Sequence, residues 1–361
     1  MKKISIVLFF VGLAVITAAI IWIGATNILK AVFSIGWGGL AILTLCQVGV
    51  ILLLAWAWHI ICPSFGFIRL FWARVIREAA ATCLPFSQVG GIIIGIRAVC
   101  FKGYPFSKSS NELSVSQGVS SNIVDITTEV LGQALFLLIG IGILISGGYI
   151  TGLKWPVLVA TFILIIAIIT MIWTQRQGNK FFQKVTNFLS QHIAQQWAQQ
   201  LSMGIDSLQE SLDQIWSNPK RVAFGSLVHF IAWMAGAVGT WICYLFLGAN
   251  INLMEAIAIE ALTCGAMSIM FLVPGSVGVQ ESAYIALGSI FGIDPNLSFG
   301  LSLLRRARDF IIGIPALMLW QFIEIRYLRK NRDEKKLDFS SIHPSKKTST
   351  NTELSDSELS S

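Results

Sequence analysis

Residues 271–282 read FLVPGSVGVQES and interrupt an otherwise apolar part of the chain. The arms on either side, Glu260–Met270 and Ala283–Phe291, are each shorter than the roughly 20 apolar residues that a helix needs to cross a bilayer. The helix-breaking residues of the interruption are Pro274, Gly275 and Gly278. Such breaks are tolerated in a membrane only inside protein or beside a wet cavity. We therefore predict a re-entrant hairpin, with Glu281 just past its tip and close to a substrate site.

A weaker copy of this pattern lies upstream, where residues 78–97 read EAAATCLPFSQVGGIIIGIR. Two short apolar arms are again joined through a proline and a pair of glycines, Pro85, Gly90 and Gly91. Paired interruptions in the two halves of an apolar chain are typical of transporters built from internal repeats. We expect a second re-entrant hairpin here.

The composition places the whole chain in the membrane. Of its 361 residues, 55% are hydrophobic and 12% are charged, and the net charge of +7 is better explained by cytoplasmic loops than by nucleic-acid binding. The scattered histidines and the cysteines, which lack C-x-x-C spacing, predict neither a metal site nor a disulfide framework. We find no phosphate-binding loop and no Gly-x-Ser-x-Gly elbow, so we expect no catalytic activity and no cofactor.

Six apolar runs are long enough to span a bilayer: Ile4–Ile23, Gly38–Ile61, Leu113–Ile145, Trp155–Trp173, Val222–Leu247 and Leu297–Ile323. Cytoplasmic chain ends satisfy the positive-inside rule, and the second span then leads into a cytoplasmic loop that carries Arg69, Arg74 and Arg77. The second hairpin has no flanking cations and enters from the outer face. We predict an all-α polytopic domain over residues 1–327, with six spans and two re-entrant hairpins arranged as an inverted repeat of about 4–146 and 155–325.

Two segments are too polar to belong to the spans. Residues 180–216 carry apolar side chains three or four apart opposite a face rich in Gln and Ser, which predicts an amphipathic helix on the cytoplasmic surface. That helix is either a lipid sensor or, more simply, a connector. Residues 333–361 are rich in Ser and Thr with no apolar period, and we expect a disordered cytoplasmic tail.

Charged residues lie at membrane depth in the third and sixth predicted spans. The third span carries a polar residue at every fourth position: Gln117, Ser121, Asp125, Glu129 and Gln133. At the rise of an α-helix, Asp125 lies about 18 Å below the membrane surface. The sixth carries Arg305, Arg306, Arg308 and Asp309 at similar depth. A charge at the centre of a span costs about 2.5–3.5 kcal/mol, so these residues face a bundle interior or a cavity. We expect the two stripes to pair, Asp125 and Glu129 with Arg305 or Arg308.

Two interpretations of these charges remain. Either they are ion pairs that hold the bundle together, or the three clustered arginines exceed that need and grip an anionic headgroup through forked hydrogen bonds. Arg97, after the first hairpin, could add to such a site or simply obey the positive-inside rule. Glu260 and Glu281 flank the second hairpin and could pair with the arginines, bind a coupling proton or contact a cationic headgroup.

With these residues in view, the chain over Ile4–Tyr327 resembles the flippase-like family named after the transmembrane region of lysylphosphatidylglycerol synthase. The most specific match is the pattern Pro-Gly-x-x-Gly-x-x-Glu that ends at Glu281, where family members often have Gly in place of Ser276. Three stretches resemble the hopanoid-biosynthesis-associated members: LPFSQVGG at 84–91, VDITTE at 124–129 and LRRARD at 304–309.

This resemblance implies movement of a polar-headed lipid between the leaflets of a bacterial inner membrane. We interpret the chain as a lipid translocase for an anionic or hopanoid-related lipid, with lipid- or hopanoid-biosynthesis enzymes as possible partners. The alternatives are a membrane-embedded transferase that uses Asp125, Glu129 or Glu281 as acid–base groups, and a non-catalytic scaffold for such enzymes.

Overall fold

A computed structural model describes residues 25–83, 87–101, 114–148, 210–270 and 278–342, together with positions 162, 166, 169, 170, 273 and 276. The chain divides into two units, Met1–Leu319 and Trp320–Ser361. All described helices before α12 lie entirely within the first unit. Helix α12 (Pro295–Ile342) begins in the first unit and ends in the second.

Four helices are long and apolar enough to cross a membrane: α2 (Ala25–Ile61), α5 (Val115–Ser146), α9 (Pro219–Phe246) and α12 over Pro295–Tyr327. They confirm four of the six predicted spans. The other two, Ile4–Ile23 and Trp155–Trp173, lie outside the described residues, apart from isolated positions in the second of them. Helix α2 also starts earlier than predicted and kinks at Gly36, whose φ of 69° is non-helical.

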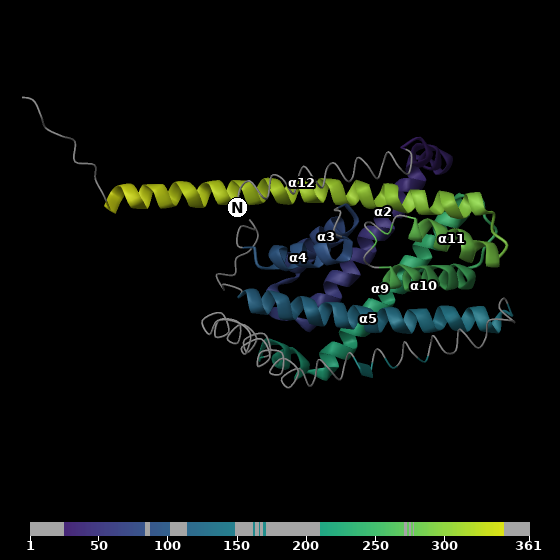
Figure 1. The fold of residues 1–361 in the computed structure, drawn as a ribbon, viewed down its shortest axis with the longest axis horizontal. Coiled ribbons are helices and arrows are strands. Elements are labelled where there is room, and N and C mark those ends of the chain that lie inside the picture. The colour runs from purple at the N-terminus through teal and green to yellow at the C-terminus, as the bar shows by residue number, and fades with distance from the viewer. Residues whose placement is uncertain are drawn as a thin grey trace, which may run out of the picture. The chain divides into compact units, whose positions relative to one another are not determined.

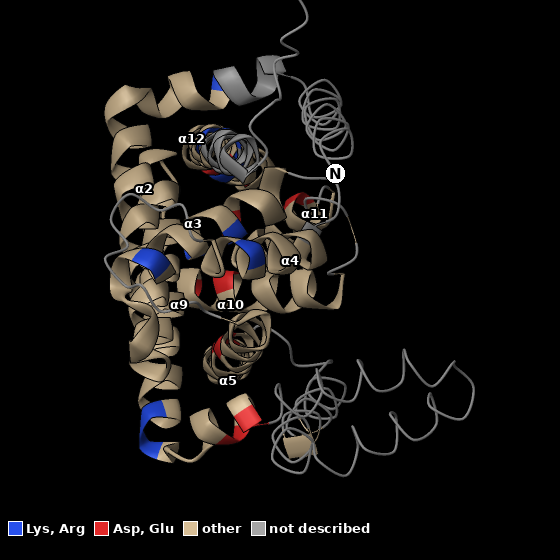
Figure 2. Cartoon of the chain, turned by 90° about the vertical axis from the view of Figure 1, so that its left-hand side faces the viewer, with Lys and Arg blue, Asp and Glu red and all other residues tan. Residues whose placement is uncertain are grey.

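Along the chain, two short helices lie between the two long helices of each half. Between α2 and α5 lie α3 (Phe67–Cys83) and α4 (Ser87–Val99), and between α9 and α12 lie α10 (Leu253–Ile269) and α11 (Val279–Ile290). The order long, short, short, long therefore occurs twice, with the predicted interruptions between the short helices. Figures 1 and 2 show the four short helices side by side between α5 and the first part of α12, with α2 and α9 along one side.

The first short pair differs from the prediction in two ways. Residues 67–77 were expected in a cytoplasmic loop, but α3 is continuous from Phe67 because no Gly or Pro occurs before its end. Gly90 and Gly91 were expected at a hairpin tip, but both lie within α4. A β-carbon at Gly91 would stand 2.8 Å from the carbonyl oxygen of Arg77, so this glycine lets α4 lie directly against α3. Pro85, Pro274 and Gly275 lie outside the described residues.

The two polar segments are described only in part. Of the predicted amphipathic helix, residues 210–216 are described and are helical. Of the predicted disordered tail, residues 333–342 are instead the end of α12. The Asp, Glu and Lys residues of this stretch are compatible with a helix that has no apolar face. The first helix-breaking proline after it is Pro344.

Small residues set the close approach of α5 to its neighbours. A β-carbon at Gly132 would stand 2.7 Å from the backbone nitrogen of Phe230 and 3.0 Å from the carbonyl oxygen of Ser226, both on α9. One at Gly140 would meet the β-carbon of Ala261 on α10. Small residues are typical of membrane helix interfaces because they allow two backbones to come together. This packing holds the middle of α5 inside the bundle.

We predict that Gly132→Ala lowers the stability of the protein by about 1–3 kcal/mol, because the added methyl group must push α9 away. Gly142 on the same helix has nothing within 4 Å of the position of its β-carbon, so Gly142→Ala is the matched control. The melting temperature in detergent measures both. Equal melting temperatures for the two variants would contradict the close crossing.

Candidate functional site: two buried arginine–carboxylate networks

The first network joins α3 to α5. Arg74 contacts Asp125 at 3.1 Å and Glu129 at 2.9 Å, and Arg77 contacts the same two carboxylates at 2.7 Å each. Arg74 also pairs with Glu78, one turn along α3, at 2.8 Å. Asp125 is fully buried and Arg74 nearly so, whereas Glu129 keeps 15% of its side chain exposed. Two guanidinium groups thus share two carboxylates through several charge-assisted hydrogen bonds, an arrangement that satisfies buried charges well.

The inner edge of this network contains buried polar atoms without a described partner. His229 on α9 is fully buried, and its Nε2 lies 3.2 Å from Oδ1 of Asp125 without the alignment of a hydrogen bond. Both amide atoms of Asn122, one turn before Asp125 on α5, also have no hydrogen-bond partner. Buried polar groups nearly always have a hydrogen-bond partner. At this edge of the network, Asn122 and Oδ1 of Asp125 are the described polar atoms of α5 that lack one.

The second network centres on Glu260 of α10, which is 2% exposed. Its carboxylate accepts hydrogen bonds from Thr240 of α9 at 2.7 Å, from Tyr284 of α11 at 2.6 Å, and from Arg305 of α12 at 2.8 Å. The guanidinium carbon of Arg305 also lies 5.5 Å from the centre of the Tyr284 ring. One carboxylate therefore connects α9, α10, α11 and α12, the helices described in full after residue 210.

Arg306 links α12 to the interrupted segment. Its Nε donates to Glu281 at 2.5 Å, and its guanidinium also donates to the backbone carbonyl of Ser276 at 3.3 Å. Glu281 in turn accepts from the backbone nitrogen of Gly278 at 2.8 Å and so caps the start of α11. Gly278 has a φ of 81°, a conformation that glycine adopts freely. The spacing from Gly278 to Glu281 therefore builds a helix start and an anchor for Arg306.

The third arginine of α12 has a weaker partner. Arg308 pairs with its neighbour Asp309 at 2.8 Å, and the Asp309 side chain is 25% exposed. Arg305 and Arg308 line a cavity of about 10 Å³ whose wall also includes Thr240 and Cys243 of α9. That volume suffices for about one water molecule. Two arginine side chains of α12 therefore border the same small space.

The predicted pairing between the third and sixth spans is wrong. Asp125 and Glu129 pair with Arg74 and Arg77, while Arg305 and Arg306 pair with Glu260 and Glu281. The predicted surplus of arginines on α12 is also wrong, because Arg305, Arg306 and Arg308 each have a carboxylate partner. The charged stripes do face the bundle interior, as the cost of charges in lipid requires.

Sequence reasoning missed Arg74 and Arg77 because their nearness to a span end suggested a loop. The signal that identifies them is the uninterrupted run from Phe67 to Cys83, which places both arginines on one helix three residues apart. Gln133, at the end of the predicted stripe, donates to Ser268 of α10 at 2.8 Å rather than joining either network. Arg97 lies in the last turn of α4 with an exposed side chain.

Comparison with known proteins adds a family and two relatives. The family profile described as "Lysylphosphatidylglycerol synthase TM region" matches residues 9–316. A "UPF0104 membrane protein" of Methanothermobacter thermautotrophicus is 21% identical over 310 residues, which cover 84% of this chain and 88% of the relative. A second UPF0104 membrane protein, from Pyrococcus horikoshii, is 20% identical over 337 residues, or 88% of this chain and 95% of the relative. No solved structure gives a significant match.

We predict that Asp125 couples energetically to Arg77 and not to Arg305. In a double-mutant cycle of Asp125→Asn with Arg77→Ala, the coupling energy in unfolding should reach about 1 kcal/mol or more, because the two side chains share a buried ion pair. The matched cycle with Arg305→Ala should give less than about 0.5 kcal/mol, as for sites that do not touch. The reverse order of the two couplings would restore the pairing between the third and sixth spans.

We also predict that Ser276→Gly stabilises the protein by up to about 1 kcal/mol, because Ser276 has a φ of 50°, where a β-carbon is strained. Thermal unfolding in detergent measures the change, and Ser276→Ala should not give the gain. A melting temperature that falls in the glycine variant would show that the serine side chain contributes more than the strain removes.

Proposed function

We propose, from the premise that this chain belongs to the family of the lysylphosphatidylglycerol synthase transmembrane region, that it moves a polar-headed membrane lipid between leaflets. The observation that carries the proposal is the cavity between Arg305 and Arg308, at the least tightly paired end of a buried charge network. A guanidinium group is expensive to place inside a membrane protein, and here two of them border one small cavity.

Exchange of anions explains how paired arginines can bind a headgroup. A phosphate or carboxylate can replace Glu260 at Arg305, or Asp309 at Arg308, as the acceptor of the guanidinium hydrogen bonds. The displaced carboxylate must then reach water or take up a proton, which costs less for Asp309, with 25% of its side chain exposed, than for the buried Glu260. The cavity of about 10 Å³ is too small for a headgroup, so binding requires it to widen.

The interrupted segment is suited to open the site. Arg306 holds Glu281 and the Ser276 carbonyl together, so any movement of α12 pulls directly on the start of α11. The repeated order of long and short helices supports our proposal that the two halves are inverted repeats with re-entrant hairpins, which rock against each other around the arginine site. In this mechanism Arg74 and Arg77 hold the first half together as Arg305 and Arg306 hold the second.

The chemistry of the cavity favours a lipid with an anionic headgroup, including an anionic hopanoid-related lipid. Transport would run down a gradient or be coupled to an ion, and no bond in the lipid would be made or broken. We place the protein in the bacterial inner membrane with both chain ends in the cytoplasm, because that orientation puts Arg97 of α4 and the cations at the end of α12 on the positive side.

We predict that Arg308→Ala reduces lipid translocation to the rate of protein-free liposomes, while the melting temperature stays close to that of the wild type. Fold should survive because the lost partner, Asp309, is the most exposed carboxylate of the second network. The assay is dithionite quenching of fluorescently labelled phosphatidylglycerol in proteoliposomes. Arg308→Lys should retain part of the activity, since it keeps the charge and loses the fork.

The matched control is Arg221→Ala, which removes an exposed arginine from the first turn of α9, away from both networks. Its translocation rate should equal that of the wild type. Unimpaired translocation by Arg308→Ala would remove Arg308 from the proposed site. Loss of translocation in both variants would point to a general effect of surface charge instead.

A further inference from the structure

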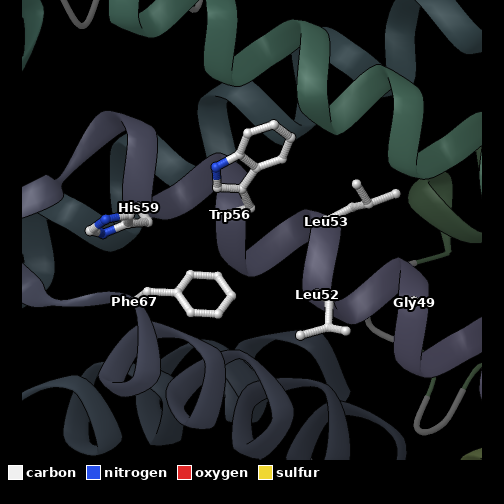
Figure 3. Close-up of a pocket in the computed structure, with 6 residues that line it drawn as sticks. All are labelled: Gly49, Leu52, Leu53, Trp56, His59 and Phe67. Atoms are coloured by element: carbon white, nitrogen blue, oxygen red, sulfur yellow. The ribbon is translucent and has the colours of Figure 1, made fainter.

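A cavity of about 500 Å³ lies beside α2, and none of the residues that line it belongs to either charge network (Figure 3). Its wall consists of Gly49, Leu52, Leu53, Trp56 and His59 of α2, together with Phe67 of α3. The five α2 residues recur at helical spacing, so they form one face of that helix. The volume lies within the range of about 300–1,000 Å³ that is typical of sites for small molecules.

The lining changes in polarity along the helix. Gly49, Leu52 and Leu53 are apolar, whereas Trp56 and His59, toward the end of α2, carry ring nitrogens. From Gly49 to His59 the helix rises by about 15 Å, which is half of the roughly 30 Å hydrocarbon core and therefore the depth of one leaflet. Beyond this end of α2, Pro63 and Ser64 are exposed, and Trp is the residue that favours the membrane interface.

The aromatic walls are held by other rings. His59 stands edge-on to Phe67 at 6.0 Å between ring centroids, and Trp56 stands edge-on to Phe224 of α9 at 6.4 Å. Such contacts restrict the side chains that border the cavity. The cavity is therefore a preformed groove along α2, and its shape does not depend on the arginine site.

We propose that this groove binds a glycerophospholipid, with one acyl chain along Leu52 and Gly49 and the headgroup at Trp56 and His59. An indole N–H only donates, and an imidazole can also donate, so these residues suit the phosphate and ester oxygens of such a lipid. The length of the groove matches a chain that reaches from the membrane surface to the midplane. This lipid site goes beyond the proposed translocation, because it would be occupied whether or not the bound lipid is the one that is moved.

Gly49 provides a way to close the groove without disturbing the protein. Nothing lies within 4 Å of the position of its β-carbon, so a larger side chain there projects into the groove instead of into a neighbouring helix. Gly142 on α5 has the same open surroundings but does not line the groove. Gly49→Trp is therefore the blocking variant and Gly142→Trp its matched control.

The test is photo-crosslinking of the full chain in nanodiscs of phosphatidylethanolamine and phosphatidylglycerol that contain a trace of phosphatidylglycerol with a diazirine in one acyl chain. Crosslinked residues are located by mass spectrometry of peptides. In the wild type we expect labelling of residues 49–67 to exceed that of the exposed face of α9 around Val238 and Leu245, away from the contact of Phe224 with Trp56. Gly49→Trp should lower the groove labelling by about tenfold, which corresponds to 1.4 kcal/mol of binding. Gly142→Trp should leave it unchanged.

Two results would overturn the proposal. Equal labelling of the groove and of the α9 face would mean that only bulk lipid covers α2, and groove labelling that survives Gly49→Trp would place the lipid elsewhere. The melting temperature of Gly49→Trp shows whether the variant is folded. Because this readout is binding, it is independent of the translocation measured for Arg308→Ala.

Discussion

A charge buried in a membrane protein needs a partner of opposite sign, and in this protein that need determines which helices touch. The guanidinium groups of Arg74 and Arg77 hold α3 against α5, and Glu260 draws α9, α11 and α12 to α10. Removal of one member of such a pair costs about 3–5 kcal/mol because its partner is left buried and unpaired. The glycines at the helix crossings serve the same geometry, since they bring the backbones close enough for the pairs to form. Figure 2 shows charged residues of both signs among the central short helices, within an otherwise mostly uncharged bundle.

The two halves use opposite arrangements of the same chemistry. In the first half the short helix α3 carries the arginines and the long helix α5 carries the carboxylates. In the second half the short helices α10 and α11 carry the carboxylates and the long helix α12 carries the arginines. The helix order is the same in both halves, but the signs of the charges are exchanged. In the second half, two of the arginines border a described cavity.

Much of this architecture follows from the sequence. The lengths of the apolar runs predicted α2, α5, α9 and α12, and the interruptions around Pro85 and Pro274 predicted the breaks between short helices. The partners of the charges did not follow, because depth along a helix says nothing about which helix lies beside it. Asp125 and Arg305 lie at similar depth on different helices, yet each is satisfied by a closer neighbour. The positive-inside rule misled in the same way at Arg74, since it counts cations near span ends and does not ask whether they continue a helix.

The separation of the paired charges along the chain has a consequence for biogenesis. Arg74 lies 51 residues before Asp125, and Glu260 lies 45 residues before Arg305. During synthesis, α3 and α10 are therefore complete while their partners are still unmade, and each carries a charge that resists entry into lipid by about 2.5–3.5 kcal/mol. Neither short helix can settle in the bilayer alone. Each must stay beside the insertion machinery, or at the membrane surface, until the following long helix has been made. We therefore expect each half to insert as one cooperative step, after its long helix is complete, and not helix by helix.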